Sequence, residues 1–330
     1  MRVLAAIDKF RGTATAAEAA AAVCRGVARA GGTAVAVPLA DGGEGTLDVL
    51  GGGNRTTTVM GPLGDPVDAP WRLTGRTAVI EMAKASGLAL VGGSAGNDPI
   101  AATTHGTGEL LATALDAGAR RIVVGVGGSA TTDGGLGAIR AVWTPGRLRG
   151  VDLVVACDVR TRFIDAAEVF APQKGATPAQ VQLLKRRLER LAQVYLDDYG
   201  VEVHEVEGGG AAGGLAGGLT VHGAALVSGF DVVADELHLD DLVAGADLVI
   251  TGEGFLDAQS FEGKVVGGVA ALAAEAGVPV LAVAGEVFDE ADAKLRTVSL
   301  VERFGRDRSL IDPTWCIEEI VADWLKSWSG

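Results

Sequence analysis

The chain has 330 residues, a formal net charge of −14, 48% hydrophobic and 5% aromatic residues, and 49 glycines. Its length suggests about two domains of roughly 150 residues each, and the apolar content is ample for folded cores. The negative charge argues against nucleic acid and anionic membrane as partners, and no apolar run reaches the roughly 20 residues of a membrane span. Three cysteines without CxxC or metal-ligand spacing predict a reducing, cytoplasmic location.

The N-terminal segment opens an α/β fold. Val3–Ile7 reads as a buried strand and is followed by the polar loop Asp8–Gly12. A helix comes next, because Thr15 and Glu18 have the spacing of a capping box. A second strand, Ala34–Leu39, then leads into the sequence ADGGEG. This order predicts a parallel sheet, in which ligands bind at the carboxyl ends of the strands.

The middle of the chain has a different texture, with short strand signals separated by turns. We expect strands at 56–59, 71–73, 77–81, 121–126 and 153–157, and helices at 107–117 and 177–199. The second helix carries an apolar stripe. Its basic residues lie mostly off that stripe and are interpreted as a solvated face: Lys185, Arg186, Arg187 and Arg190.

The C-terminal third returns to the α/β pattern. Leu248–Thr251 reads as a strand and is followed by the loop TGEGFLD and a helix to about residue 276. Further strands are expected at Pro279–Ala284 and Val298–Val301, and a closing amphipathic helix at Ile317–Trp328. We therefore predict a doubly wound α/β domain from residues 1–55 and 228–330, with an α+β domain at 56–227 inserted between its halves.

Three short loops place carboxylates among glycines: Ala40–Gly45, Thr131–Gly137 and Thr251–Asp257. Glycine lets backbone N–H groups approach phosphate oxygens, and carboxylates hold magnesium. The loops together suggest an enzyme that handles a phosphorylated ligand, although an acid flanked by glycines can also simply cap a turn. The candidate acids are Asp41, Glu44, Asp133, Glu253 and Asp257.

Two segments, Gly125–Ala130 and Gly208–Gly213, match the dinucleotide fingerprint G-x-G-x-x-G/A. The first is followed by a turn-like stretch where a helix should begin, which disfavours NAD. Either segment could cradle phosphate groups, or its glycines could serve close backbone packing.

Read together, ten segments resemble the bacterial type I glycerate kinase family. They occur in the order of that family and span almost the whole chain. They are DKFRG (8–12), ADGGEGT (40–46), EMAKASGL (81–88), GTGEL (106–110), GGSATTDGG (127–135), PQKGA (172–176), GGGAAGGL (208–215), ADLVITGEG (246–254), LDAQS (256–260) and GK (263–264).

The resemblance implies transfer of the γ-phosphoryl group of ATP to D-glycerate with Mg²⁺, giving 2-phosphoglycerate. It also implies that the domain built from both chain ends is flavodoxin-like. The carbon that is phosphorylated, the preferred sugar acid and the oligomeric state do not follow from the sequence.

The resemblance also suggests roles for single residues, since phosphoryl transfer depends on positioning and charge neutralisation. Lys9 and Arg11 would hold the glycerate carboxylate or the transferred phosphoryl group, and Asp41 would accept the hydroxyl proton. The expected metal or water-shell ligands are Glu44, Asp133 and Glu253. The expected ATP-binding residues are Gly127, Gly128, Ser129, Gly252, Gly254 and Lys264.

One departure from the family pattern stands in the third loop. Many members carry arginine where this chain has Phe255, and the stretch 138–149 is short. Two alternatives therefore stay open. The first is a nucleotide-dependent oxidoreductase that uses the Gly125–Ala130 segment, and the second is a non-catalytic, metabolite-binding relative.

Overall fold

The computed structural model describes residues 1–10, 12–142, 145–261, 263–288 and 294–328. Its contacts divide the chain into an end unit, Met1–Asp41 with Phe230–Gly330, and a middle unit, Gly42–Gly229. The first division falls after Asp41, whereas the sequence interpretation places it after residue 55. The residues between follow the middle unit because the backbone N–H groups of Gly45 and Leu47 donate to the Glu81 carboxylate.

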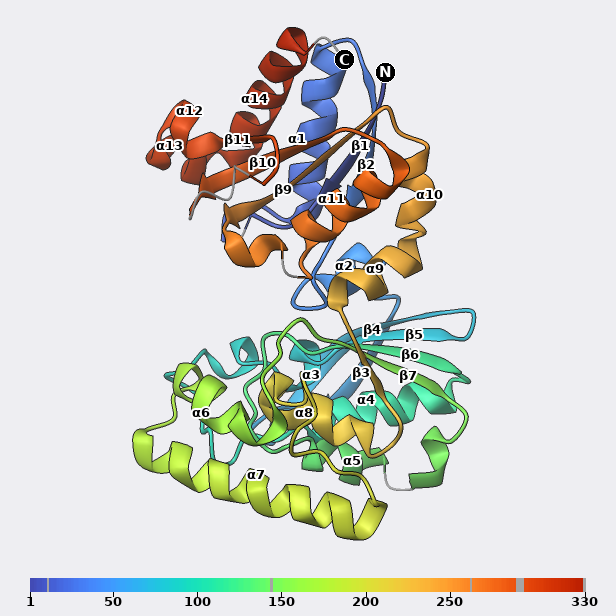
Figure 1. The fold of residues 1–330 in the computed structure, drawn as a ribbon. Helices are drawn as coiled ribbons and strands as arrows, with labels where there is room; N and C mark the ends of the chain where they lie inside the picture. The colour runs from blue at the N-terminus through green and yellow to red at the C-terminus, as the bar shows by residue number, and fades with distance from the viewer. Residues whose placement is uncertain (11, 143–144, 262, 289–293, 329–330) are drawn as a thin grey trace. The chain divides into compact units, whose positions relative to one another are not determined.

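The end unit contains a five-stranded parallel sheet in the order β11-β10-β9-β1-β2 (Figure 1). Its strands are β1 (Arg2–Ile7), β2 (Thr33–Pro38), β9 (Leu248–Leu256), β10 (Val280–Val287) and β11 (Thr297–Ser299). Strand β1 lies in the interior, with Val3 opposite both Ala34 and Leu248. This order is that of flavodoxin, which confirms the predicted fold class.

Helices cover both faces of this sheet. They are α1 (Ala16–Arg29), α10 (Leu239–Ala244), α11 (Val265–Ala276), α12 (Leu300–Phe304), α13 (Arg306–Ile311) and α14 (Pro313–Ser327), and α9 (Gly229–Leu237) begins at the last residue of the middle unit. Alternate residues of β1, namely Val3, Ala5 and Ile7, share a core with α1 and α14. Val266 of α11 packs with β10 in a separate cluster. The arrangement is doubly wound, as predicted.

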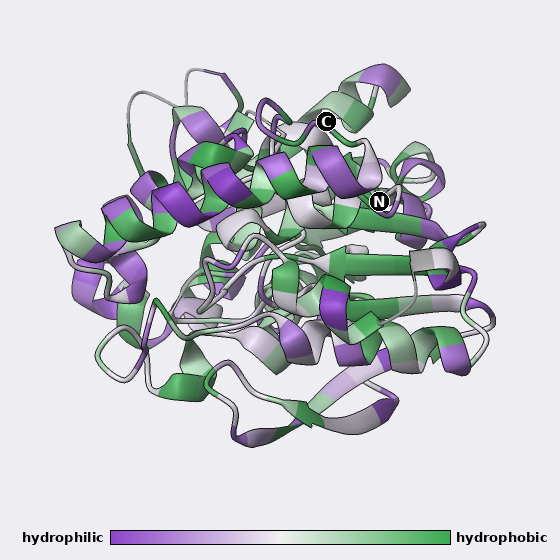
Figure 2. Ribbon diagram, turned by 90° about the horizontal axis from the view of Figure 1, so that it is seen from below, coloured by the Kyte–Doolittle hydropathy of each residue, from purple (hydrophilic) through white to green (hydrophobic). Residues whose placement is uncertain are grey.

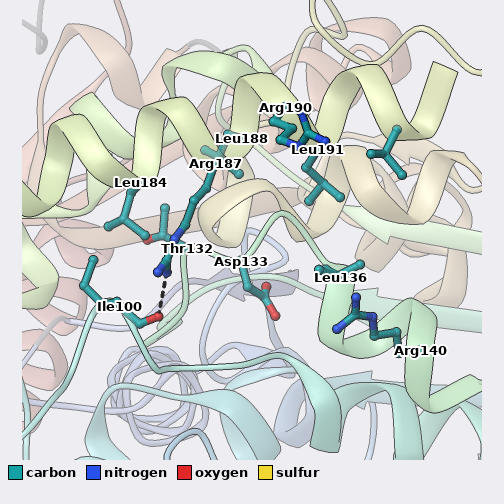
Figure 3. A pocket seen from close by; sticks show the side chains of 11 residues that line it. Ile100, Thr132, Asp133, Leu136, Arg140, Leu184, Arg187, Leu188, Arg190 and Leu191 are labelled. Atoms are coloured by element: carbon teal, nitrogen blue, oxygen red, sulfur yellow. Dashed lines mark hydrogen bonds between the residues drawn. The ribbon is translucent and has the colours of Figure 1, made fainter. Parts of the chain in front are cut away.

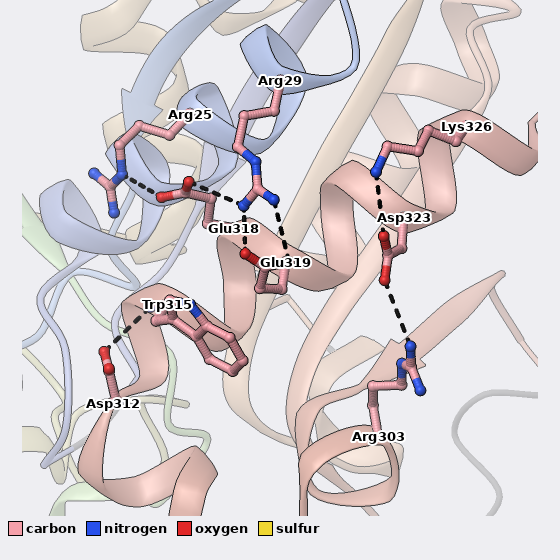
Figure 4. A network of polar contacts seen from close by, with 9 residues as sticks. All are labelled: Arg25, Arg29, Arg303, Asp312, Trp315, Glu318, Glu319, Asp323 and Lys326. Carbon is pink, nitrogen blue, oxygen red and sulfur yellow. Dashed lines mark hydrogen bonds and ion pairs between the residues drawn. The ribbon is translucent and has the colours of Figure 1, made fainter.

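Helices α1 and α14 approach closely. A Cβ atom at Gly26 would lie 2.7 Å from the carbonyl oxygen of Glu318, so glycine permits the crossing. Ion pairs flank the contact: Arg25 Nε lies 2.7 Å from Glu318 Oε2, and Arg29 pairs with both Glu318 and Glu319 (Figure 4). These arginines are half-exposed, so the close packing stabilises the contact more than the charges do.

Strand β9 runs further than the sequence predicts. The segment TGEGFL, expected as a loop, is its second half and stays paired with β10 through Glu253 opposite Ala284 and Leu256 opposite Val287. Gly252 has a packing reason, because a Cβ atom there would lie 2.1 Å from the carbonyl oxygen of Val283. Pairing with a neighbouring strand thus overrides the local glycine signal.

The middle unit contains a mixed six-stranded sheet in the order β3-β4-β5-β6-β7-β8. Strands β3 to β5 form an antiparallel meander, and β5 to β8 run parallel. The strands are β3 (Arg55–Met60), β4 (Pro66–Thr74), β5 (Thr77–Glu81), β6 (Arg121–Gly125), β7 (Asp152–Ala156) and β8 (Ala225–Val227). The helices are α2 (Thr46–Val49), α3 (Ala83–Ser86), α4 (His105–Asp116), α5 (Leu136–Val142), α6 (Ala166–Phe170), α7 (Pro178–Tyr199) and α8 (Ala211–Thr220).

Helix α7 is amphipathic. It begins at a capping box between Thr177 and Gln180, as Thr15 and Glu18 begin α1. Its residues Leu184 and Leu188 are buried in a cluster with Phe163, which lies in a 3₁₀ turn before α6. In Figure 2 several strands are mainly hydrophobic in colour, whereas the helices mix hydrophobic and hydrophilic residues.

Candidate active site

The carboxyl ends of β1 and β9 form the topological switch point of the end unit. The chain leaves β1 toward β2, whereas β9 leads to β10 and β11 on the other side. Ligands of open α/β sheets bind at this position. Asp8 directly follows β1, and its backbone N–H donates to the carbonyl oxygen of Gly252 at 2.9 Å. Glu253 follows in β9, and Asp41 lies three residues beyond the end of β2.

Two carboxyl groups at this edge are held in unfavourable surroundings. Burial raises the pKa of Asp8 to about 6; the charge of Lys9 lowers it and that of Asp41 raises it. Burial also raises the pKa of Glu253 to about 7, against a hydrogen bond from Ser260. The Oε1 atom of Glu253 is buried and has no hydrogen-bond partner among the described residues. Carboxyl groups with pKa values raised in this way, at the carboxyl ends of strands, are typical of functional sites.

Two lysines balance the negative charge. Lys9 Nζ lies 3.5 Å from Asp41 Oδ1. Lys264 is the N-cap residue of α11, and its charge lowers the pKa of both Asp8 and Glu253. The N-terminus of α11 adds the positive end of a helix dipole. Arg11, the third predicted catalytic residue, lies outside the described residues.

Two glycine loops of the middle unit pack backbone to backbone. A Cβ atom at Gly127 would lie 2.7 Å from Gly43 Cα and 2.9 Å from the Glu44 nitrogen. Gly128 has a φ of +69°, which glycine adopts without strain. The segment 127–129, predicted to bind ATP, therefore touches the loop that carries Glu44. Gly127 is required by this approach and Gly128 by its backbone conformation, whatever the segment binds.

A buried lysine anchors the same segment. Lys174 is 3% exposed, and its Nζ donates to Ser129 Oγ at 2.7 Å and to the carbonyl oxygen of Thr131 at 2.6 Å. Burial lowers its pKa to about 7, and only the charge of Asp133 opposes this. The lysine fixes the position of the Ser129 hydroxyl.

Asp133 is surrounded by donors. Its Oδ2 accepts hydrogen bonds from Thr104 N at 2.8 Å, Thr104 Oγ1 at 2.9 Å and Gly137 N at 3.2 Å, and its Oδ1 accepts from Gly135 N at 3.1 Å. This geometry indicates that Asp133 holds the loop in place, and it disfavours the metal contact that the sequence predicts. Within the described part of the chain, no group of three or more His, Cys, Asp or Glu side chains is arranged to hold a metal ion.

Comparison with known proteins decides the family. The profile of the glycerate kinase family matches residues 3–144 and 142–305. The chain belongs to the glycerate kinase family. A glycerate kinase of Halalkalibacterium halodurans is 38% identical over 98% of this chain and 99% of its own, and the glycerate 2-kinase of Escherichia coli K12 is 38% identical over 88% and 86%.

A solved structure supports the same family. A Salmonella typhimurium LT2 protein, assigned provisionally as glycerate kinase 2, superposes with a TM-score of 0.85. It is 34% identical and covers 99% of this chain and 98% of its own.

Phe255 is the position at which, from the sequence, this chain is expected to depart from the family pattern. The side chain is 44% exposed, and its ring lies 6.1 Å from that of Phe288, which is 42% exposed. Next to it, the carbonyl oxygen of Gly254 would lie 2.4 Å from a Cβ atom at Gly285. This edge of the end unit therefore presents two exposed aromatic rings.

The dinucleotide fingerprints have structural explanations. After Gly125 the chain stays irregular until α5 begins at Leu136, so no helix N-terminus faces the first match. In the second match, a Cβ atom at Gly213 would lie 2.0 Å from the carbonyl oxygen of Thr131. Close packing explains both glycine runs, and membership of the glycerate kinase family favours a kinase over an oxidoreductase.

The structure thus gathers Lys9, Asp41, Glu253 and Lys264 in the end unit, and places Glu44, Ser129 and Asp133 in the middle unit. From the sequence, Asp8 was placed in the loop after the first strand, where ligands bind, but it was given no role of its own, although a charged residue directly after a buried strand was a usable signal. Among the described residues, no helix is both long and apolar enough to cross a membrane.

Proposed function

We propose that the chain transfers the γ-phosphoryl group of ATP to a hydroxyl group of D-glycerate, giving 2-phosphoglycerate and ADP. One observation carries the proposal: in a member of the glycerate kinase family, Asp8 and Glu253 meet Lys9 and Lys264 at the ligand-binding edge of a flavodoxin-like sheet. A cytoplasmic location is in keeping with the odd number and spacing of the cysteines.

The proton and phosphoryl steps follow from the charges. The glycerate hydroxyl oxygen forms a bond to the γ-phosphorus while the bond to the β–γ bridging oxygen breaks, and ADP leaves. Asp41 takes the hydroxyl proton. Lys9, which lies 3.5 Å from Asp41, would hold the glycerate carboxylate or the transferred group. Lys264 at the N-terminus of α11 would hold ATP phosphates.

The residues present fit a magnesium ion. Mg²⁺ is usually held by one or two carboxylates together with substrate phosphates and water, so it needs no three-carboxylate cluster. The unpartnered Oε1 of Glu253 offers such a ligand, with Asp8 beside it in charge contact. When bound, the ion would neutralise charge on the phosphates. Glu44 stays a predicted ligand, and the donors around Asp133 leave it little capacity.

An assay of ADP release over a panel of small hydroxy acids tests the proposal. We expect release that depends on D-glycerate, and phosphorus NMR of the product fixes the carbon. Asp41→Asn should lower kcat at least about 100-fold, the usual worth of a general base. Asp240→Asn, an exposed position in α10 of the same unit, is the matched control.

Other outcomes would identify the rivals. Near-wild-type turnover of Asp41→Asn would remove this residue as the base. Tight glycerate binding without ADP release would support a non-catalytic relative, in which Phe255 marks lost chemistry. A change in nicotinamide fluorescence on mixing with NAD(H) would instead favour the oxidoreductase.

A further inference from the structure

A cavity lies in the middle unit beneath helix α7 and shares no lining residue with the cluster at the switch point (Figure 3). Its volume is about 420 Å³, within the range of small-molecule sites. Most of its wall is apolar and consists of Ile100, Leu136, Leu184, Leu188, Leu191 and Val194. A ligand held here must therefore carry an apolar body.

Three arginines line the same cavity. Arg187 and Arg190 come from α7, and Arg140 comes from α5 on the opposite side (Figure 3). Arg187 Nη1 donates to the carbonyl oxygen of Ile100 at 3.0 Å. Within the described ranges, Arg140 and Arg190 form no hydrogen bond or ion pair. The solvated-face interpretation of the α7 basic residues is therefore incomplete, because two of these arginines line a cavity.

A buried hydroxyl group also faces the cavity without a partner. Thr132 lines it and is 2% exposed, and its Oγ1 makes no hydrogen bond in the described part of the structure. A buried, unsatisfied polar atom costs about 1–3 kcal/mol, so it needs an explanation. A ligand oxygen would satisfy it.

The charge balance in the cavity favours an anion. Its one acidic wall residue, Asp133, has its carboxylate oxygens engaged by Thr104, Gly135 and Gly137. Three arginines against this one carboxylate leave an excess of two positive charges, in a chain whose net charge is −14. Glycerate and ATP phosphates match the charge but lack the apolar body that the leucine wall would cover.

We propose that this cavity is a binding site for a small organic anion with an apolar body. The charged end lies between Arg140 and Arg190, the apolar body packs against Leu188 and Leu191, and an oxygen accepts a hydrogen bond from Thr132. This site stands independently of the proposed kinase reaction.

Anilinonaphthalene sulfonate, an anion with an apolar aromatic body, is a suitable probe, and N-phenylnaphthylamine is its neutral counterpart. We expect the sulfonate to bind the full chain with one-to-one stoichiometry in a fluorescence titration. Val194→Asp, which adds a negative charge to the wall, should weaken binding at least about tenfold. Leu196→Asp is the matched control, because Val194 and Leu196 lie on one helix and are both 36% exposed, but Leu196 does not line the cavity.

A second variant isolates the arginines. Arg140→Gln combined with Arg190→Gln should weaken sulfonate binding about fivefold and leave the neutral probe within about twofold. Arg186→Gln, an exposed α7 residue outside the cavity, should change neither. The double variant also decides the case if Val194→Asp fails to fold, since both arginines are exposed.

Several results would overturn the proposal. Equal effects of Val194→Asp and Leu196→Asp would indicate non-specific surface binding, as would several probes bound per chain. If the arginine variant bound neither probe, the arginines would not be recognising the negative charge, and the proposed preference for an anion would be wrong. A dimer that dissociates as the sulfonate binds, seen by sedimentation, would identify the cavity as an interface with a second copy.

Discussion

Glu253 and Asp133 stand in similar sequence surroundings, TGEG and TTDGG, yet their surroundings in the fold differ. Glu253 is partly buried at the end-unit site, with its Oε1 unpartnered among the described residues and a pKa raised to about 7. Asp133 is wrapped by backbone and threonine donors of the middle unit. An acid among glycines is thus an ambiguous pattern, and the donors around the carboxylate separate a ligand-binding role from a loop-holding one.

The largest expected difference between the two acids is catalytic. Glu253→Gln should lower kcat/KM for glycerate about 1,000-fold, because a metal or phosphate contact worth several kcal/mol would be lost. The ADP-release assay measures this, with the exposed α11 residue Glu275→Gln as control. Activity within tenfold of wild type would place Glu253 outside the reaction.

For Asp133 we expect the main effect on the stability of the fold, in contrast to the catalytic effect expected at Glu253. Asp133→Asn places an amide NH₂ among the donors of Thr104, Gly135 and Gly137, so the free energy of unfolding should fall by roughly 3 kcal/mol. Urea unfolding measures the loss, and the exposed Asp65→Asn is the comparison. An unchanged midpoint would mean that these hydrogen bonds do not hold the loop.

Glu253→Gln should stabilise the free protein at alkaline pH. The folded pKa, about 7, exceeds the ordinary value of 4.5, so the contribution of Glu253 to stability is fully present below about pH 4.5 and is lost as the pH rises through 7. The glutamine variant avoids this loss and should gain roughly 2 kcal/mol at pH 8. Urea unfolding without ATP or magnesium at pH 5 and pH 8 tests this; an equal gain at both values would contradict it.

The smallest expected effect concerns Lys174, the buried lysine of the middle unit that donates to Ser129 and Thr131. Its folded pKa, about 7, lies below the ordinary 10.5, so the unfolded chain binds more protons between these values and stability rises with pH. From pH 8 to pH 9 this contribution should rise by about 1 kcal/mol in the wild type and be absent in Lys174→Met. Urea unfolding at the two pH values measures this, and an equal change of the free energy of unfolding in both proteins would show that the amine is not buried as described.

Much of the local structure could be predicted from the sequence because its causes are local. The capping box of Thr15 and Glu18 and the apolar stripe of α7 both appear as expected. The parallel order of the end unit follows from the strand–helix alternation. The extension of β9 could not be predicted, because it depends on pairing with β10.

The candidate site was only partly predictable, for the same reason. Lys9, Asp41 and Lys264 were recognisable from their motifs at element ends. The satisfaction of Asp133 depends on Thr104, which is remote in sequence, and the burial of Lys174 has no local signal. Such properties arise from tertiary surroundings and need a structure.

Strand β1 pairs with β9 although more than 200 residues separate them, as the register of Val3 with Leu248 shows. During synthesis β1 therefore remains without its partner β9, while the contiguous middle unit, Gly42–Gly229, can already assemble. Joining the two strands closes a long loop, which is an entropically expensive and slow event. Asp8 and Glu253 come together only at that late moment, so partly synthesised chains would lack the paired carboxyls altogether.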